Sequence, residues 1–460
     1  MKYVAFFLAL LGAVPLAVIA ALNRRMLSLV AFCLLVPLLL FNATSINFFS
    51  LEFYRGTSRG MEVSLVYVLA LAMVMAAAVK GRLRNPFPDL GSLIYLVYFI
   101  LSALSIRQAT VHELNGVFLD GMFVDGILVD GAALGLMELW KMVMMGLVFY
   151  AVYLYLDYVR NPTALLRGIA VVVVFCFLEV VKQHYVGISQ ARGTFPHQNS
   201  MAMFMMMVAP VFFVYYLDFA KSAPSFYLYA FAFICGSASL FRSYSRGAMA
   251  CYPVASAIAA FLCVKRNFKS SFAVRMLPLV LIGMLGMLLL LPKIIDRFEH
   301  ASSQSGDTRK RFAGMALRMM EAHPYTGVGL NNWGLNVRTD EYLSDDDIEA
   351  RWHETGIVET VYLLVGAECG IPALIVLLCW YAYYWITAFR LSARLAGTRW
   401  FFLPTGIFAG LTGCYLQSTL EWVMKQQVNF VVTMVFFATL AWLNRNWRAL
   451  KAEEGMKKLS

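Results

Sequence analysis

Two short motifs near the middle of the chain place arginine beside glycine at the start of an apolar run. Residues 192–199 have the sequence RGTFPHQN, and residues 245–248 have the sequence SRGA. A guanidinium group can bind two oxygens of a phosphate at once. Arg192 and Arg246 are therefore candidates to hold one phosphate or diphosphate group. The alternative is that both side chains only anchor their segments at a membrane surface.

A second set of ionisable residues lies further along the chain. Arg311 stands in a long polar segment, His353 and Glu359 stand near its end, and Glu368 lies inside the next apolar run. Transfer of a group to a hydroxyl needs a general base, which a histidine or a carboxylate of raised pKa can supply. His353 and Glu359 are the candidates. Each also has a simpler interpretation. His353 can be a loop histidine without a catalytic role, and Glu359 can be a carboxylate that stabilises a helix start.

Glu368 is the deepest of these groups in apolar sequence. Ionisable residues in such segments are usually functional or paired, so a hydrogen-bonded structural role is the alternative to an acceptor-binding role. Three acid–base pairs have helical spacing near the ends of apolar runs and are expected to pair with each other. They are Glu138/Lys141, Glu179/Lys182 and Glu421/Lys425.

The composition identifies the elements that must position these residues as membrane helices. Of 460 residues, 61% are hydrophobic and 14% are charged, against about 45–50% and 25% in soluble domains. This excludes a cytosolic enzyme, a disulfide-rich secreted domain and a disordered chain. The net charge of +11 is attributed to basic loops on the cytoplasmic side of a membrane rather than to nucleic-acid binding.

Apolar segments predict an all-α polytopic membrane protein with about 12–13 transmembrane helices. The segments are 3–22, 26–41, 61–79, 90–106, 137–156, 168–183, 200–217, 225–241, 247–264, 276–291, 357–388, 400–417 and 428–443. The second is short for a full span. The eleventh carries Pro372 early, which predicts a short helix, a break near Pro372, and then the span.

Basic residues decide the orientation. The inner loops are 23–25, 80–89, 157–167, 218–224, 265–275, 389–399 and 444–460, and they hold 20 lysine and arginine residues in 70 positions. The rule that cytoplasmic loops are enriched in these residues places them inside. The two arginine motifs and the long polar segment 292–356 then lie outside.

The segment 292–356 is the one soluble-looking part of the chain. Helical spacing over 309–322 places Phe312, Met315, Ala316 and Met319 on one face, which predicts a small helical cap over the membrane helices. A repeat of Asp-Gly at 120, 125 and 130 predicts turns, with a cation site as the less favoured alternative. Because neither metal-ligand spacing of Cys and His nor a glycine-rich phosphate loop occurs, we expect no metal and no nucleotide cofactor.

In this order the motifs resemble the O-antigen ligase and O-antigen polymerase family, over roughly residues 165–443. The resemblance rests on GTFxHxN at 193–199, SRGA at 245–248, Arg311 with HPxxGVG at 323–329, and ExGIP at 368–372. These proteins of the bacterial inner membrane transfer glycans from undecaprenyl diphosphate on the periplasmic side. The resemblance implies a helical membrane fold similar to the GT-C type, a metal-independent reaction and inversion at the anomeric carbon.

The chain departs from the family pattern at three places. Gln198 stands where the family often has proline, and Gln190 stands where it often has arginine. Glu359-Thr360 stands where it often has His-Asn. The general base is therefore His353 by its chemistry or Glu359 by its position, with Glu359 orienting His353 or binding the acceptor in the first case.

We expect four parts of the chain: transmembrane helices with short loops over 1–291, a large periplasmic loop domain over 292–356, C-terminal transmembrane helices over 357–443, and a cytoplasmic tail over 444–460.

The function expected from residues and resemblance together is that of an O-antigen ligase-like glycosyltransferase. It would move a glycan from undecaprenyl diphosphate to an acceptor hydroxyl of a glycan, lipid or protein, within membrane lipids and with no nucleic-acid partner. Arg192, Arg246 and Arg311 would bind the diphosphate. His197, Asn199 and Glu368 would bind the acceptor or support the site. The alternatives are a polymerase that joins lipid-linked repeats, and a flippase or transporter, which would more typically carry paired broken helices at mid-membrane.

Overall fold

A computed structural model describes most of the chain. The described residues are 2–40, 45–51, 53–114, 117–119, 122–219, 222–223, 225–268, 272, 274–277, 281, 303–345 and 356–459. Most of the expected segment 276–291 lies outside these ranges. His353 also lies outside them.

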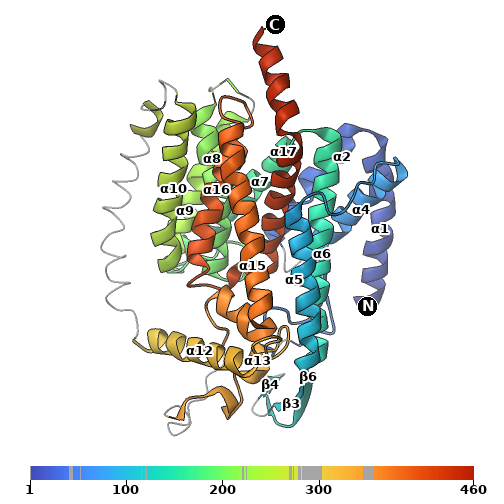
Figure 1. The fold of residues 1–460 in the computed structure, drawn as a ribbon, viewed down its shortest axis with the longest axis vertical. Coiled ribbons are helices and arrows are strands. Elements are labelled where there is room, and N and C mark those ends of the chain that lie inside the picture. The colour runs from blue at the N-terminus through green and yellow to red at the C-terminus, as the bar shows by residue number, and fades with distance from the viewer. Residues whose placement is uncertain are drawn as a thin grey trace.

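The described chain is mainly helical, and its helices stand side by side in a bundle (Figure 1). The long helices are α1 (Lys2–Leu22), α2 (Arg24–Cys33), α4 (Leu65–Val79), α5 (Leu90–Ser105), α6 (Gly131–Val159), α7 (Thr163–Tyr185), α8 (Gln198–Asp218), α9 (Phe226–Arg242), α10 (Arg246–Asn267), α12 (Ser303–Ala322), α15 (Val361–Arg394), α16 (Phe402–Gln417) and α17 (Gln427–Leu459). Short helices are η1 (Val36–Leu40), η2 (Ile106–Gln108), α13 (Trp333–Asn336), η3 (Asp340–Tyr342) and η4 (Val423–Lys425).

Seven of the described helices are long and apolar enough to cross a membrane, namely α6, α7, α8, α10, α15, α17 and the continuous α5–η2 segment. Three shorter apolar stretches are Leu10–Leu22, Leu65–Val79 and Phe226–Arg242. The chain is therefore an all-α polytopic membrane protein, as predicted. The number of twelve to thirteen spans stays a prediction, since 276–291 lies largely outside the described residues.

The first expected helices differ from the prediction at their ends. Segment 26–41 is divided between α2 and η1, in keeping with its short length. Residues 61–64 were expected to be helical but form strand β2 (Met61–Ser64), which pairs antiparallel with β1 (Ser45–Phe48). The side chain of Ser64 accepts a hydrogen bond from the Val66 N–H at 3.0 Å. This cap starts α4 one residue later, so residues 61–64 are left to pair with the preceding segment.

Two further hairpins precede α6. Strand β3 (Val111–Leu114) pairs with β6 (Ile127–Asp130), and β4 (Val117–Leu119) pairs with β5 (Met122–Val124). Gly126 has φ +75° in the turn before β6, a conformation that favours glycine. The Asp130 side chain caps α6 by accepting from Ala132 N–H at 2.8 Å. The Asp-Gly repeats thus form a turn and a helix start where they are described; Asp120-Gly121 lies outside the described residues.

The bundle has two distinct ends (Figure 1). The α12 end carries α12, α13 and the hairpins β3–β6. The C-terminal end carries the last residues of α17, which extend beyond the other helices. Helix α12 lies across the bundle and packs against α15. Its residues Phe312, Met315, Ala316 and Met319 are all buried, so the predicted apolar face and the helical cap are confirmed.

The basic loops that were assigned to one side contact one another. Arg24 and Arg82 both lie over the ring of Tyr158. The remaining contacts are Arg160 with Glu453, Arg399 with Glu454, Arg394 with Trp447, Arg167 with Ser225, and Arg266 with the carbonyl of Phe389. These contacts join basic loops of different helices at the C-terminal end of the bundle.

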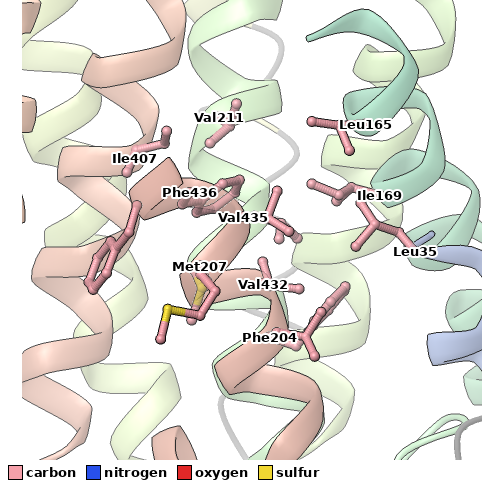
Figure 2. Packing of buried hydrophobic residues seen from close by; sticks show 14 of the residues in the cluster. Leu35, Leu165, Ile169, Phe204, Met207, Val211, Ile407, Val432, Val435 and Phe436 are labelled. Carbon is pink, nitrogen blue, oxygen red and sulfur yellow. The ribbon is translucent and has the colours of Figure 1, made fainter. Parts of the chain in front are cut away.

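Helix α8 lies at the centre of the core and is buried along almost its whole length. It is apolar on all sides, as expected for a helix surrounded by other helices. Figure 2 shows three of its residues, Phe204, Met207 and Val211, among side chains of α16 and α17. Gly406 and Gly410 let α16 approach closely: an added Cβ would lie 2.3 Å from Val211 Cα and 2.4 Å from Met207 O. This packing fixes the position of α8, whose first turn carries Asn199.

Candidate functional site

Two of the sequence motifs bind each other through their backbones. The segment 324–329 lies against the middle of α15, around residues 367–371. Three hydrogen bonds join them: Val328 N–H to Ala367 O at 2.9 Å, Gly329 N–H to Glu368 O at 3.0 Å, and Ile371 N–H to Pro324 O at 2.8 Å. The HPxxGVG and ExGIP motifs therefore form one structural unit, which fixes the connection between α12 and α15.

The break in α15 occurs at Gly370, two residues before the predicted Pro372. Gly370 has φ +81° inside the long helix. An added Cβ would lie 2.5 Å from the carbonyl carbon of Tyr325. The approach of the 324–329 segment thus requires glycine at this position, and Pro372 follows in the first turn after the break, where it costs no helical hydrogen bond.

Glu368 belongs to a buried cluster of charges. Lys425 Nζ lies 3.3 Å from a carboxylate oxygen of Glu368 and 3.5 Å from one of Glu138. Lys141 pairs with Glu138 at 2.6 Å, and the Trp333 N–H donates to Glu368 at 3.3 Å. The arrangement gives Glu368 a structural partner. The expected Glu138/Lys141 pair is present, as is Glu179/Lys182 at 3.4 Å.

The prediction that Glu421 pairs with Lys425 is wrong. Lys425 turns to Glu138 and Glu368 instead, while Glu421 contacts Asn199 and Arg309. The reason is local: the segment between α16 and α17 is a turn followed by η4, not an α-helix. Residues four apart therefore do not share a face here.

A cavity of about 780 Å³ lies between the segments of the α12 end. Residues 47–62, before α4, and the first half of α6 supply Arg55, Arg59 and Lys141 to its lining. Three other segments also line it, each directly before or between spans. They are 196–199 before α8, 356–359 before α15, and 421–428 between α16 and α17. Residues from opposite ends of the sequence thus meet in one polar space.

The segment before α8 is held by Gln183, at the end of α7. The side-chain oxygen Oε1 of Gln183 accepts from the backbone N–H groups of Arg192 at 2.9 Å and Gly193 at 3.0 Å, and its side-chain amide donates to Gly193 O at 2.8 Å. Gly193 has φ +57°, and an added Cβ would lie 2.3 Å from Cys176 Sγ. These contacts explain the glycine in the motif. The exposed Arg192 guanidinium group donates to Pro196 O at 3.4 Å.

His197 and Asn199 both line the cavity. The His197 Nδ1 atom accepts from Asn199 N–H at 3.2 Å and so caps α8. Partial burial of the ring and then the nearby charge of Arg192 lower the pKa of His197. The histidine is therefore kept neutral, as an acceptor at Nδ1 requires. The amide of Asn199 donates to a carboxylate oxygen of Glu421 at 2.5 Å.

Glu359 and Glu421 share one guanidinium group. Arg309, on α12, forms an ion pair with Glu359 through Nε, and its Nη2 lies 3.9 Å from Glu421 Oε1. Burial raises the pKa of Glu359, although the charges of Arg309 and Arg246 act against that. Burial and the neighbouring Glu359 raise the pKa of Glu421 to about 8, against the opposing effects of Arg309, Asn199 and Arg246.

Arg246, on α10, acts on the same two carboxylates through its charge. It begins that helix, and the next residue, Gly247, lies against the end of α16: an added Cβ would be 3.4 Å from Leu420 Cδ1. Arg192 and Arg246 are thus not cavity-lining residues themselves, but each acts on residues that are.

The remaining predicted site residues are Arg311 and His353. Arg311 lies on α12, two residues beyond Arg309, and is not among the residues that line the cavity. His353 lies outside the described residues. Gly356, three residues later, does line the cavity and accepts a hydrogen bond from Trp333 Nε1 at 2.9 Å.

Sequence reasoning missed Arg309, Glu421 and the segment 47–62. Arg309 stands three residues before Phe312, so helical spacing places both on the face that α12 turns toward the bundle. Glu421 was assigned to a pair with Lys425. The segment 47–62 gives no motif and is brought to the site by packing alone.

The lining combines groups that suit a glycan. Amides of Asn47, Gln426 and Gln427 and the rings of Trp140 and Trp422 stand beside the charged groups. Amides can hydrogen-bond sugar hydroxyls, and indole rings offer apolar faces. No cluster of three His, Cys, Asp or Glu side chains that could hold a metal occurs in the described part of the chain.

Comparison with known protein families gives a match over part of the chain. Residues 231–378 match the model of a family described as O-antigen ligase. The matched region runs from α9 into α15, so it contains Arg246, Arg309 and Glu359, whereas Arg192 and Glu421 lie outside it. A search of curated proteins finds no match.

Proposed function

We propose, from the premise that residues 231–378 belong to the O-antigen ligase family, that this protein is a membrane glycosyltransferase that takes its glycan from a polyprenyl diphosphate. The donor would be an undecaprenyl-diphosphate-linked glycan. The acceptor would be a hydroxyl group of a glycan, lipid or protein. The fold would be of the GT-C type, in the bacterial inner membrane, with the α12 end facing the periplasm.

The observation that carries the proposal is the cavity at the α12 end. His197 and Asn199 of the first motif line it together with Glu359, and Arg246 of the second motif acts on Glu359. Its volume of about 780 Å³ lies within the range of about 300–1,000 Å³ that is usual for ligand sites. Three segments far apart in sequence are thus gathered at one end of the bundle.

The arginines would act on the leaving group. Arg192 and Arg246 would bind the diphosphate, with Arg311 as a third candidate from α12. Negative charge grows on the diphosphate as its bond to the anomeric carbon breaks, and fixed guanidinium groups stabilise that charge. The acceptor oxygen attacks the anomeric carbon from the opposite side, which inverts its configuration, and no metal takes part.

The acceptor hydroxyl must lose a proton during this attack. The sequence predicts His353 or Glu359 as the general base for this step. Glu359 faces the cavity with Arg309 as an ionic partner. A polymerase that joins lipid-linked repeats would use the same donor and cavity, and the identity of the acceptor separates it from a ligase.

The test is transfer by purified, reconstituted protein with a polyprenyl-diphosphate-linked oligosaccharide as donor. We expect Arg246→Ala and Arg192→Ala each to lower transfer by about 10²-fold or more, because each removes fixed charge from the leaving group. The control is Arg107→Ala, an exposed arginine at the same end whose segment does not line the cavity. Near wild-type transfer by both arginine variants would favour simple anchoring at the membrane surface.

A further inference from the structure

We propose that Glu421 is the general base that removes the proton from the acceptor hydroxyl. This inference rests on the proposed glycosyl transfer and assigns a step of it to a residue outside the motifs. It also lies outside the region matched by the O-antigen ligase model.

The geometry places Glu421 where an acceptor would bind. Glu421 lines the cavity beside Trp422 and Gln426, and its side chain is only 8% exposed. Asn199 donates to one of its carboxylate oxygens. The group is therefore oriented by a neutral amide at hydrogen-bond distance, while its charged partner Arg309 lies farther away, at 3.9 Å.

Glu359 lies closer to its charged partner than Glu421 does. Glu359 is in direct contact with Arg309 Nε and is 37% exposed, whereas the same guanidinium group is 3.9 Å from Glu421. A carboxylate in close contact with arginine is a weak proton acceptor, because the pair favours its ionised form. Glu359 thus fits the role of holding Arg309, and Glu421 is the more basic of the two.

The position of Glu421 is fixed by two packed elements. Val361 N–H, at the start of α15, donates to Ser418 O at 3.3 Å. The Asn429 side chain, on α17, donates to Val423 O at 3.0 Å and to Ser200 O at 3.3 Å. These bonds hold the turn 418–423 against both α15 and α8. A catalytic group needs such rigid support.

The charges around Glu421 adjust its basicity. Glu359 faces it from the segment before α15, Arg309 from α12, Arg246 from α10, and Asn199 from α8; His197 lines the same cavity. Burial and Glu359 outweigh the rest and raise the pKa to about 8. A base is most effective when its pKa lies near the working pH, and about one-tenth of Glu421 would be ionised at pH 7.

The step balances as one proton transfer and one substitution. The proton of the acceptor hydroxyl moves to a carboxylate oxygen of Glu421. The acceptor oxygen forms a bond to the anomeric carbon of the donor. The bond from that carbon to the diphosphate oxygen breaks, and its electron pair leaves with the polyprenyl diphosphate. Glu421 then releases its proton to water.

The decisive variant is Glu421→Gln, which keeps the size of the side chain and can still accept from Asn199. We expect kcat to fall by about 10²–10⁴-fold, the usual contribution of a general base, while KM for the donor stays unchanged. The control is Glu179→Gln, a carboxylate in an exposed pair on α7, which should keep wild-type transfer. If Glu421→Gln retains kcat within about threefold of wild type, the assignment is wrong.

The pH profile separates a base from a structural group. Because the ionised form is the active one, kcat of the wild type should rise about tenfold per pH unit below about pH 8 and level off above it. The residual activity of Glu421→Gln should lack this inflection. Should Glu421→Gln fail to fold, Glu421→Asp serves instead. It keeps a carboxylate and should shift the inflection, and an unshifted inflection would contradict the proposal.

Failure of the two proposals can be told apart. If the wild type transfers nothing from a polyprenyl-diphosphate donor, the proposed function is wrong. If the wild type is active, Arg246→Ala is inactive and Glu421→Gln is active, only the assignment of the base is wrong.

Discussion

Lys425 lies between two buried carboxylates that come from different helices, Glu138 of α6 and Glu368 of α15. A buried ion is tolerated only when it is paired, because removal from water costs several kcal/mol. Glu138 has a second partner in Lys141, whereas the described cationic partner of Glu368 is Lys425 alone. This lysine thus connects α6, α15 and the turn before α17.

Replacement of Lys425 by methionine should therefore destabilise the protein. We expect a loss of about 3–5 kcal/mol, since Glu368 would be left buried and uncompensated. The midpoint of thermal unfolding, followed by tryptophan fluorescence in detergent, measures it. Lys182→Met is the control, because its pair with Glu179 is exposed and such pairs contribute about 0–1 kcal/mol. Equal midpoints for both variants would contradict the role of Lys425.

Spacing alone could not identify the partner of Lys425. Glu138 and Lys141 pair as predicted because α6 is a continuous helix through both. Glu421 and Lys425 have a similar spacing, but the segment between them is a turn followed by η4, which ends at Lys425. A sequence pattern gives the partner only where the backbone is a regular helix, and the contacts across helices that decide Glu421 are set by packing.

The kink of α15 is the element on which the site depends most directly. The backbone of 324–329 approaches it so closely that Gly327 and Gly370 both lack room for a side chain: added Cβ atoms would lie 2.4 Å from Ala367 O and 2.5 Å from Tyr325 C. This contact connects α12, with Arg309, to α15, which follows Glu359. The shared guanidinium group therefore depends on two glycines.

Gly370→Ala tests this dependence. The new methyl group clashes with backbone, and alanine is strained at φ +81°, which costs about 1–3 kcal/mol before the clash is added. We expect a lower unfolding midpoint and reduced transfer. Gly12→Ala is the matched control: it lies within α1 and its added Cβ would meet nothing within 4 Å. A Gly370→Ala protein as stable as Gly12→Ala would show that the two segments can separate.

Periodicity predicted the elements of this site better than their contacts. The apolar face of α12 is confirmed at Phe312 and Met319 because helical spacing determines it. The strand at 61–64 was missed, since the four residues MEVS adjoin an apolar helix and are too few to establish a period of their own. The cavity wall that contains Arg55 and Arg59 follows from that strand pair, so it was missed too.

At the scale of the whole molecule, the polar groups of the candidate site lie at the α12 end of the bundle, and the basic loops lie at the C-terminal end. The matched region supplies Arg246, Arg309 and Glu359. Asn199 and Glu421 come from α8 and from the turn after α16, which flank that region in sequence. Helix α8 packs against both α16 and α10, so the buried core positions all of these groups. The motifs predicted a site at one end, and the packing of α8 determines which residues share the cavity.

The side of the membrane on which the cavity opens is the last consequence of this arrangement. The loops assigned to the cytoplasm carry 20 lysine and arginine residues, and loops rich in these residues stay inside. We therefore expect α12 outside and the end of α17 inside.

Cysteine labelling tests this orientation. After replacement of the exposed Cys379, Lys310→Cys offers an exposed site on α12, where the native side chain is 85% exposed. Lys451→Cys offers an exposed site on α17. A membrane-impermeant maleimide should label Lys310→Cys in intact spheroplasts and Lys451→Cys only after lysis. The reverse pattern would place the cavity in the cytoplasm, where it could not serve a periplasmic transfer.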